Sequence, residues 1–279
     1  MARTLLCLGH GHVASALARR LAPEAWTIIG TRRTAAQDAT ARIVVFDGET
    51  AATSLIDLVA AADAVLVSIP PDEEGDLSFR VMGDALRRRT GWTGYLSTTG
   101  VYGDRGGGWV FEDDPCAPTS PPPARRVLAE RQYLSLPTPA HIFRLPGIYG
   151  PGRSALDRLR AGEARRVVKA GLVLSRAHED DIAAALALSI AQPHAGRIYN
   201  VCDDEPAPPQ EVTAYAALLL GMAAPREIAF EDANLPQASA RFYMDSKRVS
   251  NARAKAELGW RPMYPGFREG LRAILKADE

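Results

Sequence analysis

The sequence lacks an excess of charge of either sign. Lysine and arginine together number 33 among 279 residues, and aspartate and glutamate also number 33. No global field therefore draws the chain to nucleic acid or to an anionic membrane. No apolar run is long enough to cross a bilayer, and the short run near the start breaks at Gly9, which is not the pattern of a signal peptide. These absences predict a cytoplasmic protein without nucleic-acid or membrane partners.

Cysteine is also scarce. Cys7, Cys116 and Cys202 lie far apart and without metal-binding spacing, which argues against a disulfide framework and against a zinc site. The acidic run that follows His178 is predicted to open a helix, where acids are ordinary dipole partners, so we expect no metal there. A chain of 279 residues can still bury a large core, either as one domain or as a domain with a smaller lobe.

What the chain does have is a glycine-rich turn at its start. The apolar run Arg3–Leu8 ends at Gly9-His10-Gly11-His12, and helix formers with apolar spacing begin at Val13. Gly9 permits a tight turn, and Gly11 lets backbone N–H groups approach a pyrophosphate at the helix N-terminus. This strand–turn–helix context predicts a dinucleotide site. His10 and His12 are either phosphate contacts or solvated loop residues.

The end of the second predicted strand indicates which dinucleotide is bound. NAD-preferring sites place an acid there, whereas this chain has Thr31-Arg32-Arg33 and no acid before Asp38. Arg32 and Arg33 suit a 2′-phosphate, because guanidinium donors match phosphate oxygens. We therefore expect NADP, with NAD less favoured; a solvated basic turn is the alternative.

Apolar strands and helices alternate along the first half of the chain. Such alternation predicts a doubly wound parallel sheet, an α/β Rossmann fold, covered on both faces by helices. After Gly150 the pattern becomes irregular and proline-rich. We expect a dinucleotide-binding domain at 1–150, rejoined by 172–202, and a small C-terminal substrate lobe formed by 151–171 and 203–279. The expected elements are strands at 3–8, 26–33, 42–46, 63–68, 94–99 and 140–145, and helices at 13–21, 53–62, 79–89 and 121–134.

Several motifs in this order resemble those of the extended short-chain dehydrogenases/reductases, of the NAD(P)-dependent epimerase/dehydratase type that acts on nucleotide sugars. The resemblance runs nearly from end to end. Besides the glycine-rich opening, the motifs are Phe46-Asp47-Gly48, Ser97-Thr98-Thr99-Gly100-Val101-Tyr102-Gly103, Phe143-Arg144-Leu145-Pro146-Gly147-Ile148-Tyr149-Gly150-Pro151-Gly152, His178-Glu179-Asp180-Asp181-Ile182, Tyr199-Asn200-Val201 and Leu258-Gly259-Trp260.

The resemblance implies further cofactor contacts. Asp47 is expected at the adenine end, where it would accept from the exocyclic amine; a helix cap is the alternative. Ile69 and Pro70 are expected to line the cofactor after the fourth strand. Pro146, Gly147 and Ile148 are expected near the nicotinamide.

The same resemblance shows an atypical catalytic centre. The family uses a Tyr with a Lys four residues later, plus a hydroxyl that Thr98 supplies here. The Tyr and Lys positions hold Pro122 and Arg126. The proton would therefore come from Tyr102, from a substrate group or from water held by Thr98, and Arg126 is a fixed cation for ribose or substrate. Tyr243 and Lys247 match the spacing formally, but they fall in a C-terminal segment that we expect to be a surface strand and turn.

Two classes of function remain. The first is an NADP-dependent oxidoreductase or epimerase-like enzyme with an altered proton donor, acting on a small polar or sugar-like molecule as a monomer or homodimer. The second is a dinucleotide-binding redox sensor or partner-binding module without turnover. The glycine loop and Thr98 favour the enzyme, and the absent Tyr–Lys pair favours the sensor.

Overall fold

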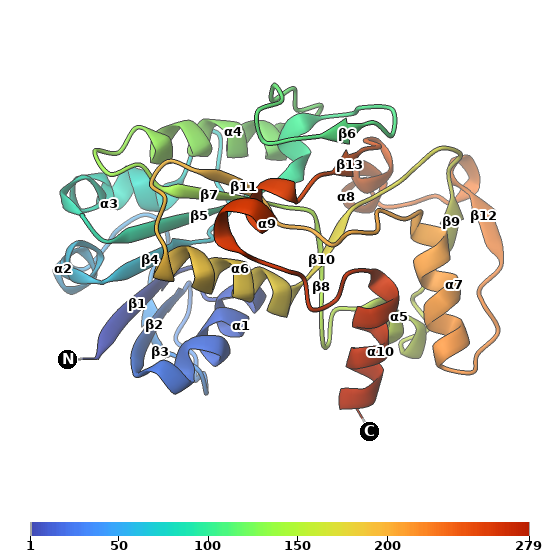
Figure 1. The fold of residues 1–279 in the computed structure, drawn as a ribbon, viewed down its shortest axis with the longest axis horizontal. Helices are drawn as coiled ribbons and strands as arrows, with labels where there is room; N and C mark the ends of the chain where they lie inside the picture. Colours follow the sequence, from blue (N-terminus) through green and yellow to red (C-terminus); the bar gives the residue numbers. More distant parts are fainter. Residues whose placement is uncertain (1, 279) are drawn as a thin grey trace.

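A parallel sheet of seven strands forms the centre of the computed structural model, which describes residues 2–278 (Figure 1). Its order is β11-β7-β5-β4-β1-β2-β3, and every neighbouring pair is parallel. The predicted doubly wound Rossmann fold is thereby confirmed. The strands are β1 (Arg3–Leu8), β2 (Trp26–Arg32), β3 (Arg42–Val45), β4 (Ala64–Val67), β5 (Trp92–Thr98), β7 (His141–Leu145) and β11 (Ile198–Asn200).

The central strands β1 and β4 are largely apolar because both faces of the sheet are buried there. In β1, Leu5 and Cys7 point into one hydrophobic core, whereas Leu6 and Leu8 point into the other. Alternate side chains of a strand face opposite sides, so one continuous apolar run supplies both layers.

Helices cover the two faces in separate groups (Figure 1). One face packs on α1 (His12–Leu21), α6 (Glu179–Ala191) and α9 (Ala252–Leu258). The other packs on α2 (Thr53–Ala61), α3 (Leu77–Arg88) and α4 (Pro121–Leu134). α4 has its predicted bounds, and α3 begins two residues before the predicted Phe79, because the Asp76 carboxylate accepts the Phe79 N–H at 3.0 Å and caps the helix.

A separate hydrophobic core lies beyond the carboxyl edge of the sheet, at the right of Figure 1. It joins α5 (Ala155–Arg160), α7 (Pro209–Leu219) and α10 (Phe267–Ala277). Beside them β9 (Arg166–Val168) pairs with β12 (Glu227–Ala229). We call this group of elements the C-terminal lobe. A capping box between Ser154 and Asp157 starts α5.

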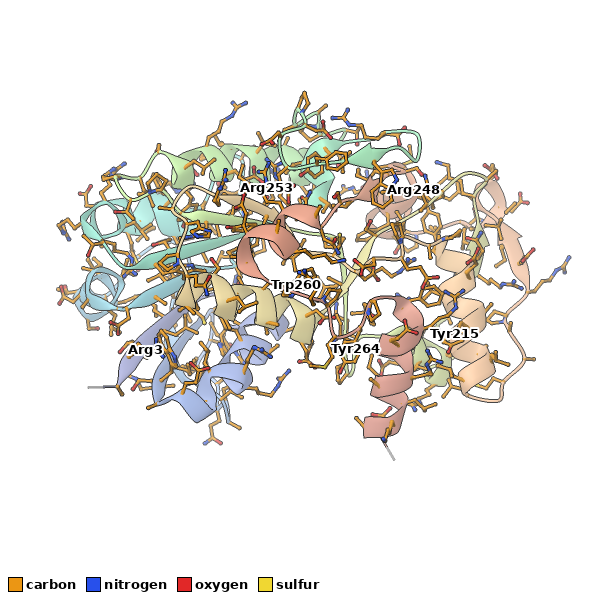
Figure 2. The ribbon with its side chains drawn as sticks, in the orientation of Figure 1. Arg3, Tyr215, Arg248, Arg253, Trp260 and Tyr264 are labelled. Atoms are coloured by element: carbon orange, nitrogen blue, oxygen red, sulfur yellow. The ribbon has the colours of Figure 1, made fainter. Side chains whose placement is uncertain are left out.

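Short elements connect the lobe to the sheet. Figure 2 shows Trp260 between α9 and α6, where its indole N–H donates to the Asp181 carbonyl at 3.0 Å. The remaining strands are β6 (Trp109–Val110), β8 (Gly147–Tyr149), β10 (Arg176–His178) and β13 (Arg248–Val249). The remaining helical turns are η1 (Ala22–Glu24), η2 (Thr99–Tyr102), η3 (Phe230–Asp232), α8 (Gln237–Ala240) and η4 (Arg241–Tyr243). None of the helices within residues 2–278 has the length and apolar character needed to span a membrane.

Candidate active site

The turn after β1 is built around Gly9. Its φ of +93° lies in the region that glycine tolerates, and a Cβ there would come within 2.6 Å of the Ser68 hydroxyl. The Gly9 N–H donates to the Thr31 hydroxyl at 2.8 Å, and the Ser68 hydroxyl donates to the Gly9 carbonyl at 2.6 Å. The loop is thus fixed against β2 and β4, and no other residue fits at Gly9.

Gly11 has a different role. It is the N-cap of α1 with φ of −110°, which any residue adopts, and a Cβ there would meet no heavy atom of the described chain within 4 Å. No side chain among the described residues caps the helix, so its first N–H groups have no side-chain acceptor at the N-cap. Val13, in the first turn, is buried in the core under α1. The helix start therefore leaves room for an anion at its positive end.

The two loop histidines point in different directions. The His10 ring is buried over Gly30, and its Nε2 lies 3.2 Å from the Thr40 hydroxyl and 3.3 Å from that of Ser15. Burial lowers the pKa of His10. The His10 side chain therefore fits neither expectation, a phosphate contact or a solvated loop residue, because Gly30 gives the ring space to turn inward. His12 is more than half exposed, with Nδ1 3.8 Å from Glu179 Oε2.

At the end of β2, the two arginines differ in their partners. Arg32 donates from Nη2 to the Asp38 carboxylate at 2.6 Å, and Asp38 also accepts from the Thr40 N–H and hydroxyl. Hydrogen bonds from Thr40 and the charges of His10 and Arg32 hold the pKa of Asp38 below its usual value, against the opposing effect of burial. Arg33 is exposed, and no carboxylate in residues 2–278 pairs with it. Asp38, which lies six residues after Arg32 in the sequence, therefore pairs with Arg32 in the fold.

The remaining expected cofactor residues line the same edge of the sheet. Asp47 is exposed and accepts the N–H groups of Glu49 at 2.8 Å and Thr50 at 3.0 Å, which lowers its pKa. It closes a turn before α2 rather than capping the helix, whose N-cap is Ala52. Ile69 lies against Gly9, and Pro70 follows it as an exposed residue.

Thr98 and Tyr102 differ in how far their side chains are buried. Thr98 is half-buried at the end of β5, and its hydroxyl accepts the Gly100 N–H at 3.1 Å, which leaves its own proton free to donate. Tyr102 is fully buried; its hydroxyl donates to Asn200 Oδ1 at 2.7 Å and accepts from Arg144 at 3.0 Å. Burial raises the pKa of Tyr102 to about 12. The hypothesis that Tyr102 donates the catalytic proton is therefore wrong, since its hydroxyl is committed to an internal network.

Arg126 lies between the carboxyl ends of β4 and β5. Its Nη1 donates to the Leu96 carbonyl at 2.7 Å, to the Tyr95 hydroxyl at 3.0 Å and to the Ile69 carbonyl at 3.4 Å. Arg126 is half-buried, and its Nη2 makes no hydrogen bond within the described chain. The positive charge of Arg126 therefore lies at the carboxyl edge of the sheet, the edge at which doubly wound folds generally bind ligands.

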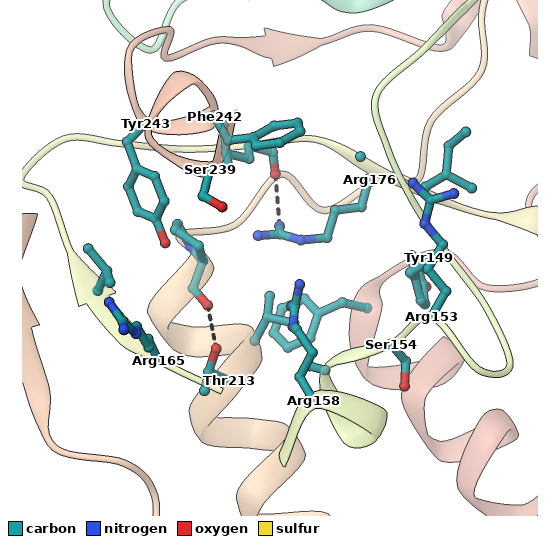
Figure 3. A pocket seen from close by; sticks show the side chains of 18 of the residues that line it. Tyr149, Arg153, Ser154, Arg158, Arg165, Arg176, Thr213, Ser239, Phe242 and Tyr243 are labelled. Carbon is teal, nitrogen blue, oxygen red and sulfur yellow. Dashed lines mark hydrogen bonds between the residues drawn. The ribbon is translucent and has the colours of Figure 1, made fainter. Parts of the chain in front are cut away.

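A cavity of about 640 Å³ lies at the C-terminal lobe, next to the segment that follows β7 (Figure 3). Pro146, Gly147 and Ile148 line one side of it, so the residues expected near a nicotinamide open onto a space of substrate size. Among the side chains that line the lobe side are those of Tyr149, Arg153, Arg158, Glu163, Arg165, Arg176, Thr213, Ser239 and Tyr243.

The sequence reasoning missed the lobe side of this cavity. Tyr243 was expected in a surface strand and turn, but it ends the helical turn η4 and lines the cavity. Lys247 is buried and pairs with Asp245 at 3.5 Å, so it does not act with Tyr243 as the spacing would imply. Two of these residues carried a signal in the sequence: Tyr149 through the Ile148-Tyr149-Gly150-Pro151 turn, and Tyr243 through its formal spacing to Lys247.

The acidic run after His178 begins α6 as predicted. His178 is the N-cap, and its Nδ1 accepts the Asp180 N–H at 3.2 Å. The residues described contain no group of three or more His, Cys, Asp or Glu arranged to hold a metal ion.

Comparison with known structures defines the class of protein. A Methylobacillus flagellatus protein classed among the NAD-dependent epimerases/dehydratases superposes with a TM-score of 0.76 at 25% identity, covering 99% of this chain and 98% of that one. A dTDP-glucose 4,6-dehydratase from Bacillus anthracis, in complex with NAD, shares the fold with a TM-score of 0.77 at 17% identity over 100% of this chain and 98% of its own. The chain therefore has the epimerase/dehydratase fold, and a solved protein with this fold holds NAD.

The family is given by relatives of higher identity. The chain is 30% identical to protein YeeZ of Escherichia coli over 92% of its own length and 95% of that protein, and it belongs to the YeeZ family. A conserved protein of unknown function from Silicibacter pomeroyi is 44% identical, with a TM-score of 0.91 over 99% of both chains. No protein-family model matches the sequence.

Proposed function

We propose that the protein is an NADP-dependent oxidoreductase of the epimerase/dehydratase type that acts on a small polar molecule in the cavity at the C-terminal lobe. The observation that carries the proposal is the position of Pro146, Gly147 and Ile148, which line that cavity. The carboxyl edge of a doubly wound sheet is where such folds bind ligands. A substrate in the cavity would lie next to the cofactor's reactive end.

The residues at the start of α1 fit a dinucleotide. The open space over Gly11 and the uncapped N-terminus of α1 suit a pyrophosphate, which backbone N–H groups would bind. Arg33, together with Arg32 once it leaves Asp38, would bind the 2′-phosphate, which supports NADP. When bound, the nicotinamide supplies or accepts a hydride.

The groups that would act at the reacting end are Thr98 and Arg126, which lie at the carboxyl edge of the sheet and are not among the residues that line the cavity. The Thr98 hydroxyl can donate to a substrate oxygen, because its oxygen already accepts from Gly100. Arg126 stabilises negative charge on that oxygen or binds the ribose, but it does not release a proton at neutral pH. The proton in the reaction therefore comes from the substrate or from water held by Thr98. We expect turnover about 10²–10⁴-fold slower than with a positioned phenol.

Calorimetry with NADPH and Gly11→Val tests the proposed cofactor site. A Cβ at Gly11 meets no heavy atom of the described chain within 4 Å, so the fold should survive, while the new side chain occupies the space proposed for pyrophosphate. We expect NADPH affinity to fall at least about tenfold, which corresponds to roughly 1.4 kcal/mol. Gly11→Ala adds only a Cβ and serves as the graded control. Wild-type affinity in Gly11→Val would overturn the assignment.

A further inference from the structure

Four arginines line the cavity on the side of the C-terminal lobe. They come from four separate segments: Arg153 precedes α5, Arg158 lies within it, Arg165 precedes β9, and Arg176 begins β10. Glu163 is the one acidic residue among the cavity-lining residues of the described chain. We call Arg153, Arg158, Arg165 and Arg176 the arginine cluster.

The arginine cluster is left without counterions, whereas its nearest sequence neighbours are paired. Arg160 binds Asp278 at 2.6 Å and Arg166 binds Glu227 at 3.0 Å, both outside the cavity. Within residues 2–278, no carboxylate lies within 4.0 Å of any guanidinium of the cluster. Along α5 and at β9, the arginines that face outward are therefore neutralised and those that face the cavity are not.

Two members of the cluster face each other (Figure 3). The side chains of Arg158 and Arg176 extend toward the same space, and the Tyr243 hydroxyl points into it. Arg176 is half-buried and held in place because its Nη1 donates to the carbonyls of Leu174 and Ala207, both at 2.9 Å. Burial lowers the pKa of Arg176, and the charge of Arg158 lowers it further, against the opposing effect of Asp203. Like charges held together in this way are stabilised by an anion between them.

The other groups near this space provide little neutralisation. Asp203 lies near Arg176, but within residues 2–278 no carboxylate oxygen of Asp203 lies within 4.0 Å of the Arg176 guanidinium nitrogens, and burial raises the pKa of Asp203. The Tyr243 hydroxyl makes no hydrogen bond to the part of the chain that the structure describes. It is therefore available to donate to a ligand oxygen.

We propose that the arginine cluster, with Tyr243, binds a substrate that carries two or more negative charges on oxygen, as a phosphate ester or a polycarboxylate. Guanidinium groups match both kinds of oxyanion with paired N–H donors. The inference rests on the proposed function, because the oxyanion is the part of the substrate that anchors the rest beside Pro146, Gly147 and Ile148.

Titration of the cofactor-free protein with pyrophosphate and with citrate tests this site. Arg158→Gln and Arg176→Gln should each lose about tenfold or more in affinity, as expected for charge-assisted hydrogen bonds. Arg160→Gln and Arg166→Gln are matched controls and should stay within about twofold of wild type, since exposed ion pairs contribute little. Binding should also weaken steeply with salt. Arg158 is exposed, so its variant keeps the test valid if Arg176→Gln unfolds.

Pyrophosphate has a second place to bind, at the start of α1, so each titration is repeated in the Gly11→Val background. Tighter binding of pyrophosphate identifies the substrate as a phosphate ester, tighter binding of citrate identifies it as a polycarboxylate, and both outcomes support the proposal. Equal losses in the cluster variants and the controls would overturn it, as would the absence of binding by both anions.

NADPH affinity, measured on the same samples, separates the two proposals. NADPH binding without anion binding overturns the present inference alone. Anion binding without NADPH binding overturns the proposed function, and with it the role of the anion as its substrate.

Discussion

Replacing Tyr102 with Phe removes one hydroxyl from a buried polar network and leaves the ring packing unchanged. The hydroxyl bonds to Asn200 Oδ1 at 2.7 Å and to Arg144 at 3.0 Å. Arg144 keeps its ion pair with Glu130 at 2.8 Å and its bond to the Glu112 carbonyl at 3.0 Å. Asn200 Oδ1, in contrast, is left buried with no partner. We therefore expect Tyr102→Phe to lower the free energy of unfolding by about 1–3 kcal/mol, the cost of one unsatisfied buried group.

Urea denaturation measures this loss, and it should appear as a lower midpoint with an unchanged m-value. Tyr264→Phe is the matched control, because this half-buried hydroxyl makes no hydrogen bond within residues 2–278, and we expect a change within about 0.5 kcal/mol. NADPH affinity and turnover of Tyr102→Phe should match wild type. Unchanged stability with a large loss of turnover would refute the reasoning and return Tyr102 to the role of proton donor.

Two further predictions concern the cofactor and pH. The double variant Arg32→Ala, Arg33→Ala should lose about ten- to a hundredfold in NADPH affinity, with little change for NADH; equal weakening of both would contradict the choice of NADP. Arg33→Ala alone leaves the Arg32–Asp38 pair in place, and its loss of NADPH affinity should be smaller than that of the double variant. Burial raises the pKa of Asp181 from 3.8 to about 6, so folding favours its protonated form. The stability this group contributes is complete below its unfolded pKa and is lost as pH rises through 6, by at most about 3 kcal/mol. The unfolding free energy of Asp181→Asn, relative to that of the wild type, should therefore increase as the pH rises from about 4 to about 7. A difference between the two proteins that does not change with pH would show that this carboxyl does not titrate as stated.

The sheet was predictable because its strands are buried on both faces and so read as unbroken apolar runs. Leu5 to Leu8 fill two cores at once, and the same pattern recurs in β4 and β5. Element ends were less predictable. α3 begins at Leu77 because Asp76 caps it, and an isolated Asp before a helix also occurs in ordinary turns.

The glycine loop was placed correctly in the chain, because the strand–turn–helix pattern around Gly9 is local in the sequence and the φ of +93° there favours glycine. The orientation of its side chains was not predictable. His10 turns inward because Gly30, on the neighbouring strand, has no side chain, and that contact depends on how the strands pair. Asp38 reaches Arg32 for the same kind of reason: the segment after β2 folds back, and distance along the sequence does not report it.

The lobe side of the cavity shows most clearly where linear spacing fails. Tyr243 attracted attention only through Lys247, four residues later, yet that lysine is buried beside Asp245. The cations that do face Tyr243 are Arg158 and Arg176, which lie far earlier in the chain and are brought to it by the packing of the C-terminal lobe. A spacing motif detects a site only when one helix or strand carries both partners. Here the phenol and the guanidinium groups come from separate elements, so their meeting depends on the tertiary core that joins α5, α7 and α10.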